Sequence, residues 1–155
     1  MEELDVQGLL DRFGQDGFQK GEQIILANFG TNQTLLSLIF GVPNRIQLID
    51  QREEAGAIIR QVYLICGDTT VCYANTKIPV AKNRNDVLLD ISVGILGLGQ
   101  IVVGHNLPNK RTLMDIGRDR SGFWRTYVIE GPELNLEIHE YFPRAPFEEV
   151  GWIKK

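Results

Sequence analysis

The chain has 155 residues, of which 43% are hydrophobic and 23% are charged, and its formal net charge is −4. These values are typical of a globular protein with one sizeable core, and we expect a single domain over residues 1–155. The acidic balance argues against nucleic acid or an anionic membrane as the main partner, because both attract basic surfaces. No apolar run approaches the roughly 18 residues of a membrane span, and the acidic N-terminus is unlike a targeting peptide, so we expect a cytoplasmic protein.

The predicted elements alternate short helices with β-hairpins. Hydrophobic spacing and turn residues place them, in chain order, as a helix at 2–13, a short apolar piece at 24–28, a helix at 34–40, strands at 45–51, 57–65 and 71–78, a helix at 87–96, an apolar segment at 101–103, a strand at 112–118 and a hairpin at 123–143. Thr31 or Asn32 is expected to cap the second helix, and Asp86 the third. The tail is expected to be a surface extension that packs Phe147 or Trp152 onto the body. Together these elements predict an α+β fold built on a single antiparallel sheet.

The clearest hairpin joins the strands at 57–65 and 71–78 through a turn at Gly67 and Asp68. Its first strand is apolar on both faces, which is typical of a strand inside a sheet rather than at its edge. Arg60 is the one charged residue of that strand, and the alternation of side chains places it on an otherwise apolar face.

The last predicted strand, LNLEIHEYFP, has a carboxylate in its apolar row. Alternation places Leu134, Leu136, Ile138, Glu140 and Phe142 on one face and Asn135, Glu137, His139 and Tyr141 on the other. An ionised carboxylate costs several kcal/mol to bury without a partner. Glu140 therefore lies at a frayed strand end in contact with water, has a buried partner, or lines a ligand cavity.

Arg60 and Glu140 allow two interpretations if their faces look into the same space. The first is a buried salt bridge, which contributes little to stability because desolvation offsets the attraction. The second is a cavity in which Arg60 binds a carboxylate and Glu140 handles a hydroxyl or a proton. Neither histidine is expected to join this site, because His139 falls on the polar face and His105 falls in a predicted loop.

The cysteines and histidines predict no metal site. Cys66 and Cys72 would lie on neighbouring strands, where a disulfide is geometrically conceivable and reduced, partly buried thiols are expected. Two cysteines and two histidines scattered along the chain do not form a zinc-binding spacing. The stretch GILGLGQIVVG is rich in glycine, but it lacks the strand before it and the Lys-Ser/Thr after it that a phosphate-binding loop requires.

Six blocks between residues 30 and 146 occur in an order typical of one known family. They are GTNQT, IIRQVYL, YANTKIP, LGLGQIV, MDIGRDRSGFWR and IHEYFPRAP. On these blocks the chain resembles the chorismate lyase family, in particular its short cyanobacterial, plastid and archaeal branch, and DIGR followed by GFW and HEYFP is the most specific combination. The chain departs from the family where Asn75 replaces an arginine, where Thr31-Asn32 replaces Gly-Ser, and where His139 replaces a common threonine.

The resemblance implies conversion of chorismate to 4-hydroxybenzoate and pyruvate, without metal or organic cofactor, as the first step toward a quinone head group. It also implies one antiparallel sheet with helices and flap loops over an internal ligand cavity. The family's carboxylate-binding arginine corresponds to Arg60 and its active-site glutamate to Glu140. Its ligand-binding backbone amides correspond to Gln33 and Leu98. Chorismate and its product are the expected partners, with no obligate protein partner.

As a mechanistic hypothesis, Arg60 anchors the ring carboxylate, and Glu140, acting as an acid, donates a hydrogen bond to the ether oxygen at the opposite end. One alternative is a non-catalytic domain of the same fold that binds or senses an aromatic acid. No DNA-binding helix-turn-helix is visible in the sequence, which disfavours a transcription regulator. A further alternative is that Arg60 and Glu140 pair with each other and leave no cavity.

Overall fold

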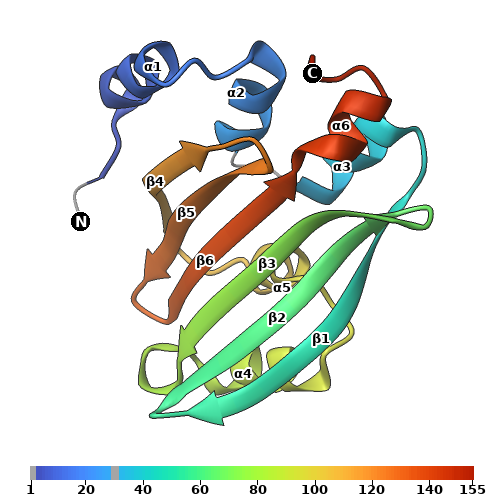
Figure 1. Ribbon diagram of the computed structural model, residues 1–155. Coiled ribbons are helices and arrows are strands. Elements are labelled where there is room, and N and C mark those ends of the chain that lie inside the picture. Colours follow the sequence, from blue (N-terminus) through green and yellow to red (C-terminus); the bar gives the residue numbers. More distant parts are fainter. Residues whose placement is uncertain (1–2, 29–31) are drawn as a thin grey trace.

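The computed structural model describes residues 3–28 and 32–155, and within these ranges it shows a six-stranded antiparallel sheet with short helices (Figure 1). The strands lie in the order β1-β2-β3-β6-β5-β4. Their bounds are β1 Asn44–Glu54, β2 Ala57–Cys66, β3 Thr69–Pro79, β4 Lys110–Arg118, β5 Gly122–Gly131 and β6 Leu134–Pro143. The α+β prediction is thereby confirmed.

Six α-helices and one short 3-10 helix accompany the sheet in the described part of the chain. They are α1 Val6–Gln15, α2 Lys20–Leu26, α3 Asn32–Phe40, η1 Val80–Lys82, α4 Asn85–Val93, α5 Leu98–His105 and α6 Arg144–Glu149. In Figure 1, α4 and α5 lie behind the sheet, whereas α1 and α2 lie at the end formed by β4, β5 and β6. The sheet thus has a helix-covered inner face and an outer face that these helices leave open.

Two three-stranded meanders make up the sheet, and they join where β3 pairs with β6. The register places Arg60 opposite Thr76 on β3, and Thr76 opposite Ile138 on β6. Glu140 lies two residues beyond Ile138, so it shares the inner face with Arg60. The two charges predicted to face one space therefore lie on β2 and β6, on either side of β3. Glu140 is offset by two residues along β6 from the position level with Arg60.

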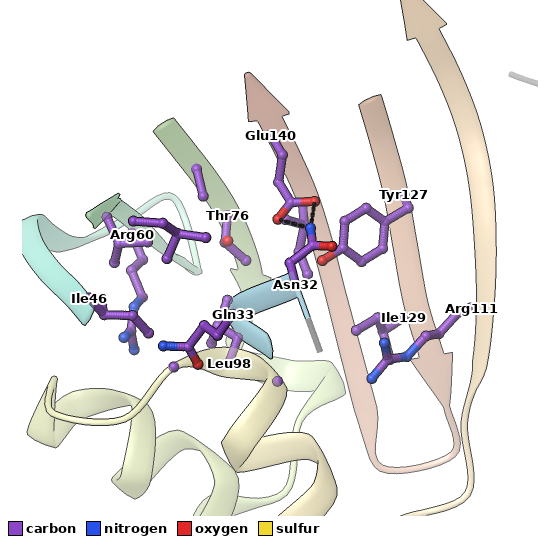
Figure 2. A pocket seen from close by; sticks show the side chains of 16 residues that line it. Asn32, Gln33, Ile46, Arg60, Thr76, Leu98, Arg111, Tyr127, Ile129 and Glu140 are labelled. Carbon is purple, nitrogen blue, oxygen red and sulfur yellow. Dashed lines mark hydrogen bonds between the residues drawn. The ribbon is translucent and has the colours of Figure 1, made fainter. Parts of the chain in front are cut away.

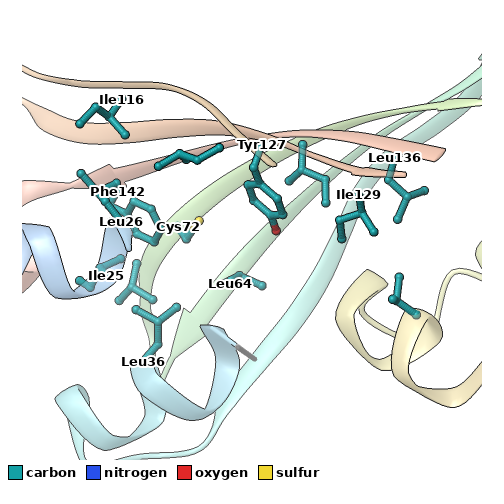
Figure 3. Close-up of a cluster of buried hydrophobic side chains, with 14 of the residues drawn as sticks. Ile25, Leu26, Leu36, Leu64, Cys72, Ile116, Tyr127, Ile129, Leu136 and Phe142 are labelled. Carbon is teal, nitrogen blue, oxygen red and sulfur yellow. The ribbon is translucent and has the colours of Figure 1, made fainter. Parts of the chain in front are cut away.

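The inner face carries the hydrophobic core. Alternation along β6 is as predicted, because Leu134, Leu136, Ile138 and Phe142 are buried while their neighbours on the other face are half-buried or exposed. Figure 3 shows this core continuing from Ile25 and Leu26 of α2 and Leu36 of α3 to the strands. Burial of these side chains, worth about 1.5–3 kcal/mol for each large one, holds the helices against the sheet.

The N-terminal helices differ from the prediction. The first helix begins at Val6, because Asp5 is its N-cap and accepts a hydrogen bond from the Gly8 amide at 2.7 Å. The apolar piece at 24–28 belongs mostly to a helix, α2, that begins at Lys20. Its start is stabilised by Glu22, which accepts a hydrogen bond from the Gln19 amide at 2.8 Å. Of the two predicted caps of α3, Thr31 lies outside the described residues, and Asn32 lies within the helix.

The segment after β3 also differs. The third predicted helix ends at Val93, because Gly94 adopts a left-handed conformation with φ of 77°. Its predicted cap, Asp86, lies in the first turn, and Arg84 is the N-cap. The predicted apolar segment at 101–103 is the middle of helix α5, which also includes His105. Glycines disfavour helix there, but burial of Ile101 and Val102 outweighs that local preference.

The C-terminal hairpin and tail need two corrections. The β5–β6 turn is formed by residues 132 and 133, one position later than predicted. The tail is not a surface extension, because residues 144–149 form helix α6, but the predicted packing of Phe147 onto the body is confirmed, since Phe147 is fully buried. Trp152 is partly buried and donates a hydrogen bond to the Gly21 carbonyl at 3.0 Å, which ties the tail to α2.

Candidate functional site

A cavity lies between the inner face of the sheet and the first turns of α3 and α5. It contains about 710 Å³ of empty space, part of which is open to solvent. Its walls combine seven apolar side chains with seven polar ones, and the apolar ones form most of the lining surface. The apolar part is formed by Ile46, Val62, Leu64, Ala74, Leu98, Ile129 and Ile138, and the polar side chains are Asn32, Gln33, Arg60, Thr76, Arg111, Tyr127 and Glu140. An apolar pocket with a few convergent polar groups is the usual form of a small-molecule site.

Arg60 brings an incompletely bonded cation to one wall of the cavity. The residue is 1% exposed, and its Nη2 donates to the Leu96 carbonyl at 2.6 Å. Its Nε and Nη1 are buried and have no hydrogen-bond partner among the described residues. Desolvation lowers the pKa of Arg60, which means that the surroundings penalise its charge. An anionic ligand could accept hydrogen bonds from Nε and Nη1 and balance the positive charge of Arg60.

The first turns of two helices border the same cavity. Leu98 is the first residue of α5 and Gln33 is the second residue of α3, and both line the space. Amides in a first turn lack partners within the helix, and they favour an anion in front of them. Gly97 allows the close approach of α5 to β1, since a Cβ there would lie 2.4 Å from Cδ1 of Ile46. The two residues expected to offer backbone amides thus lie where such amides can face a ligand.

Glu140 lies on the opposite side of the cavity from Arg60, as Figure 2 shows. It is 4% exposed, and its Oε1 accepts a hydrogen bond from Arg125 Nε at 2.7 Å. The Asn32 side-chain amide donates to Oε1 and Oε2 at 3.2 and 3.1 Å. Of the three explanations for this carboxylate, the frayed strand end is wrong, whereas the buried partner and the cavity wall both apply.

Arg125 is the buried partner, a residue that the sequence-based predictions did not include. It lies on β5 directly opposite Glu140 and is 2% exposed. Its Nη1 donates to the Asn28 carbonyl at 2.7 Å and to carbonyls at the end of α2, and its guanidinium carbon lies 4.6 Å from the centre of the Tyr127 ring. The presence of Arg125 means that Glu140 is not the lone charge the sequence suggested.

Arg60 and Glu140 do not form a salt bridge. Across residues 3–28 and 32–155, the ion pair of Glu140 is with Arg125, while both Arg60 and Glu140 line the cavity. The interpretation in which the two predicted charges simply pair and leave no space is therefore wrong. What the structure brings together is a cation with unused donors and an anchored carboxylate, separated by a space lined mainly with apolar side chains.

Two further polar residues of the cavity wall escaped the sequence analysis. Tyr127 is 9% exposed, and its hydroxyl points into the cavity in Figure 2. Burial raises the pKa of this phenol above its ordinary range, so it is neutral at physiological pH and can donate a hydrogen bond. Arg111 lines the same side of the cavity and lowers the cost of negative charge at the Tyr127 oxygen.

Both histidines lie away from the cavity wall. His139 is on the outer face, where its Nδ1 lies 3.0 Å from Thr126 Oγ1. The Nε2 of His105, the last residue of α5, lies 2.5 Å from Oδ2 of Asp90 on α4. Cys66 and Cys72 are buried thiols that are not joined in a disulfide. In the described ranges, no group of three or more His, Cys, Asp or Glu side chains is placed to hold a metal ion. No described helix is long and apolar enough to cross a membrane.

Comparison with known proteins adds one distant relationship. The chain is 28% identical over 102 residues to a protein of Methanocaldococcus jannaschii named “putative lyase”. It is a distant homologue of that protein. The match covers 62% of this chain and 55% of the relative, so the chain spans about half the length of the curated protein it matches. No protein-family model matches the sequence.

Proposed function

We propose that the protein is a chorismate lyase, which converts chorismate to 4-hydroxybenzoate and pyruvate. The observation that carries the proposal is the opposition of Arg60, with two buried donors unused, and Glu140, anchored across a largely apolar cavity. Distant homology to a protein named as a lyase, and the resemblance of six sequence blocks to the chorismate lyase family, support a lyase reaction. The product would serve as the precursor of a quinone head group, as the resemblance implies.

The Arg60 side of the cavity suits the ring carboxylate of chorismate. A carboxylate there can accept hydrogen bonds from Nε and Nη1 of Arg60, which lie buried without partners in the described residues. The backbone amide of Leu98, in the first turn of α5, can donate to the same group. Fixing this carboxylate places the ring among the apolar side chains of the cavity, which exclude water and restrict the ring to one orientation.

The reaction removes the enolpyruvyl group and makes the ring aromatic. The bond between the ring carbon and the ether oxygen breaks, and the ether oxygen leaves as the carbonyl oxygen of pyruvate. The neighbouring ring carbon loses its hydrogen, and the enolpyruvyl methylene gains one to become the methyl group. The ring hydroxyl stays and becomes the phenol of 4-hydroxybenzoate. Because aromatisation drives the reaction, the protein has mainly to hold one conformer and stabilise developing charge.

The hydrogen bonds of Glu140 favour a role that differs from the sequence-based hypothesis. Arg125 and Asn32 donate to this carboxylate, and such contacts suit an ionised acceptor better than an acid that donates to the ether oxygen. We assign Glu140 to accept a hydrogen bond from the ring hydroxyl, which lies para to the ring carboxylate. Arg111 and the neutral phenol of Tyr127 line the adjacent wall, where the enolpyruvyl carboxylate would lie.

Incubation with chorismate tests the proposal directly. We expect the wild-type protein to release 4-hydroxybenzoate, followed by its absorbance, and pyruvate, measured separately, in equal amounts and above a protein-free control. If 4-hydroxybenzoate raises the unfolding temperature but chorismate gives no product, the protein is a non-catalytic aromatic-acid binder. Neither product nor protection would contradict both the enzyme and the binder.

A further inference from the structure

The carboxylate of Glu140 is one member of a closed ring of hydrogen bonds. Arg125 donates to Glu140 Oε1 at 2.7 Å and to the Asn28 carbonyl at 2.7 Å. The Asn28 side chain donates to Asn32 Oδ1 at 3.1 Å, and Asn32 donates back to Glu140 Oε2 at 3.1 Å. The ring links strands β5 and β6 to the end of α2 and the start of α3. It therefore fixes the carboxylate relative to the helices that border the cavity.

The two oxygens of Glu140 differ in their contacts. Oε1 accepts from both Arg125 and Asn32, whereas Oε2 accepts only from Asn32 among the contacts within the described ranges. A carboxylate oxygen can accept two hydrogen bonds, so Oε2 keeps acceptor capacity. The residue lines the cavity and is nearly fully buried, which means that water cannot freely supply that bond.

We infer that Arg125 and Asn32 are positioning residues that hold Glu140 as a hydrogen-bond acceptor, so that the cavity selects aromatic carboxylates with a hydroxyl opposite the acid group. The kind of ligand rests on the proposed function, and the roles of the two residues go beyond it. Arg125 is the counter-ion of the carboxylate and donates a hydrogen bond to it, which offsets part of the cost of burying both groups. Asn32 fixes the plane of the carboxylate, because its amide bonds both oxygens while its own oxygen is held by Asn28.

A second buried glutamate has a different arrangement and provides a matched comparison. Glu22 is fully buried, and its Oε2 accepts from Arg144 Nη1 at 3.0 Å. Its Oε1 accepts from the Gln19 amide at 2.8 Å and from Arg118 Nε at 3.2 Å. Neither Glu22 nor Arg144 lines the cavity. Loss of that pair should reduce stability without changing ligand choice, whereas loss of the ring around Glu140 should change ligand choice.

Calorimetric titration with 4-hydroxybenzoate and with benzoate tests the inference on the wild type, Asn32→Leu, Arg125→Lys and Arg144→Gln. Asn32→Leu keeps the side-chain shape without its donor. Arg125→Lys keeps the charge but cannot bond Glu140 and the carbonyls at once. We expect the wild type to prefer 4-hydroxybenzoate by about tenfold, the value of one good hydrogen bond. The preference should fall to about twofold or less in both Asn32→Leu and Arg125→Lys while benzoate affinity changes little.

Arg144→Gln, which alters the buried pair outside the cavity, is the control variant. Arg144→Gln should unfold at a lower temperature and keep the full preference. A tenfold preference that survives in Asn32→Leu, or an equal weakening of both ligands, would overturn the inference and leave the proposed function standing. The wild type could prefer 4-hydroxybenzoate and the variants lose that preference while no protein turns over chorismate. That result would support the inference and contradict the proposed enzymatic function. Failure of the wild type to bind either acid would overturn both.

Discussion

Arg60 and Arg125 are two arginines buried on the same face of one sheet, and they are used in opposite ways. Arg60 is 1% exposed and Arg125 is 2% exposed. Arg125 bonds a carboxylate and several backbone carbonyls, whereas Arg60 bonds one carbonyl and leaves Nε and Nη1 without partners in the described structure. The comparison shows that burial alone does not reveal the role of a charged residue. The partners that it lacks are more informative.

The two arginines differ in the energetic cost of their burial. Breaking a buried ion pair by removal of one partner costs about 3–5 kcal/mol, because the other charge is left uncompensated. Each buried donor without a partner costs about 1–3 kcal/mol, so a ligand that accepts hydrogen bonds from Nε and Nη1 of Arg60 would remove that cost on binding. Unpartnered donors at Arg60 beside a paired Arg125 are the distribution that the proposed anion site at Arg60 predicts.

The largest expected effect is that of Glu140→Gln on turnover. The amide retains the shape but loses the charge that orients the ring hydroxyl and balances Arg125, so kcat for chorismate should fall by about 100-fold or more. Unfolding by urea should also occur at lower concentration, because Arg125 loses its counter-ion. Wild-type turnover in this variant would remove Glu140 from the chemistry.

Arg60→Met should weaken ligand binding without lowering the stability of the ligand-free protein. Affinity for 4-hydroxybenzoate is expected to fall by about 10- to 100-fold, since up to two charge-assisted hydrogen bonds are lost. The free energy of unfolding without ligand should stay the same or rise, because the substitution removes a desolvated cation with unused donors. Calorimetry and urea titration measure the two quantities. A variant that is much less stable but binds normally would reverse the assignment of the two arginines.

The smallest expected effect is alkaline destabilisation arising at the Glu140 side of the cavity. Burial raises the pKa of the Cys72 thiol well above its usual value of 9.0, and the pKa of the Tyr127 phenol above its usual value of 10.0. The unfolded chain therefore loses these protons first as the pH rises. Stability should be complete below about pH 9 and decline above it, and Cys72→Ala should reduce the slope between pH 9 and 10. Urea midpoints that stay flat to pH 10.5 would contradict this.

Alternation along the strands was sufficient to find Arg60 and Glu140, because one charge in an apolar row is visible in the sequence. The same rule could have found Arg125, which alternates with the buried Phe123 and Tyr127. A turn centred on Gly131 and Pro132 would have placed Phe123 opposite Glu140, whereas the observed turn at 132 and 133 places Arg125 there. A shift of one residue in a hairpin changes every cross-strand partner.

The remaining parts of the site depend on contacts between segments far apart in the chain. Asn32 reaches Glu140 across 108 positions, and no local pattern signals such a hydrogen bond. Helix α5 was missed because its glycines disfavour a helix locally, although packing of Ile101 and Val102 in the core stabilises one. Helix caps were predicted least well, since Asp86 lies in the first turn of α4 and Asp5, which caps α1, was not predicted, whereas the turn at Gly67 and Asp68 is confirmed.

A crystal structure of the protein with 4-hydroxybenzoate would test whether Arg60 and Glu140 bind the two ends of one ligand. We expect the ligand carboxylate to accept hydrogen bonds from Nε and Nη1 of Arg60 and from the Leu98 amide, while its hydroxyl donates to Oε2 of Glu140. Arg125 and Asn32 should keep their bonds to Glu140 in that complex. A ligand bound in the reverse orientation, or bound outside the cavity with the donors of Arg60 still unused, would contradict the account.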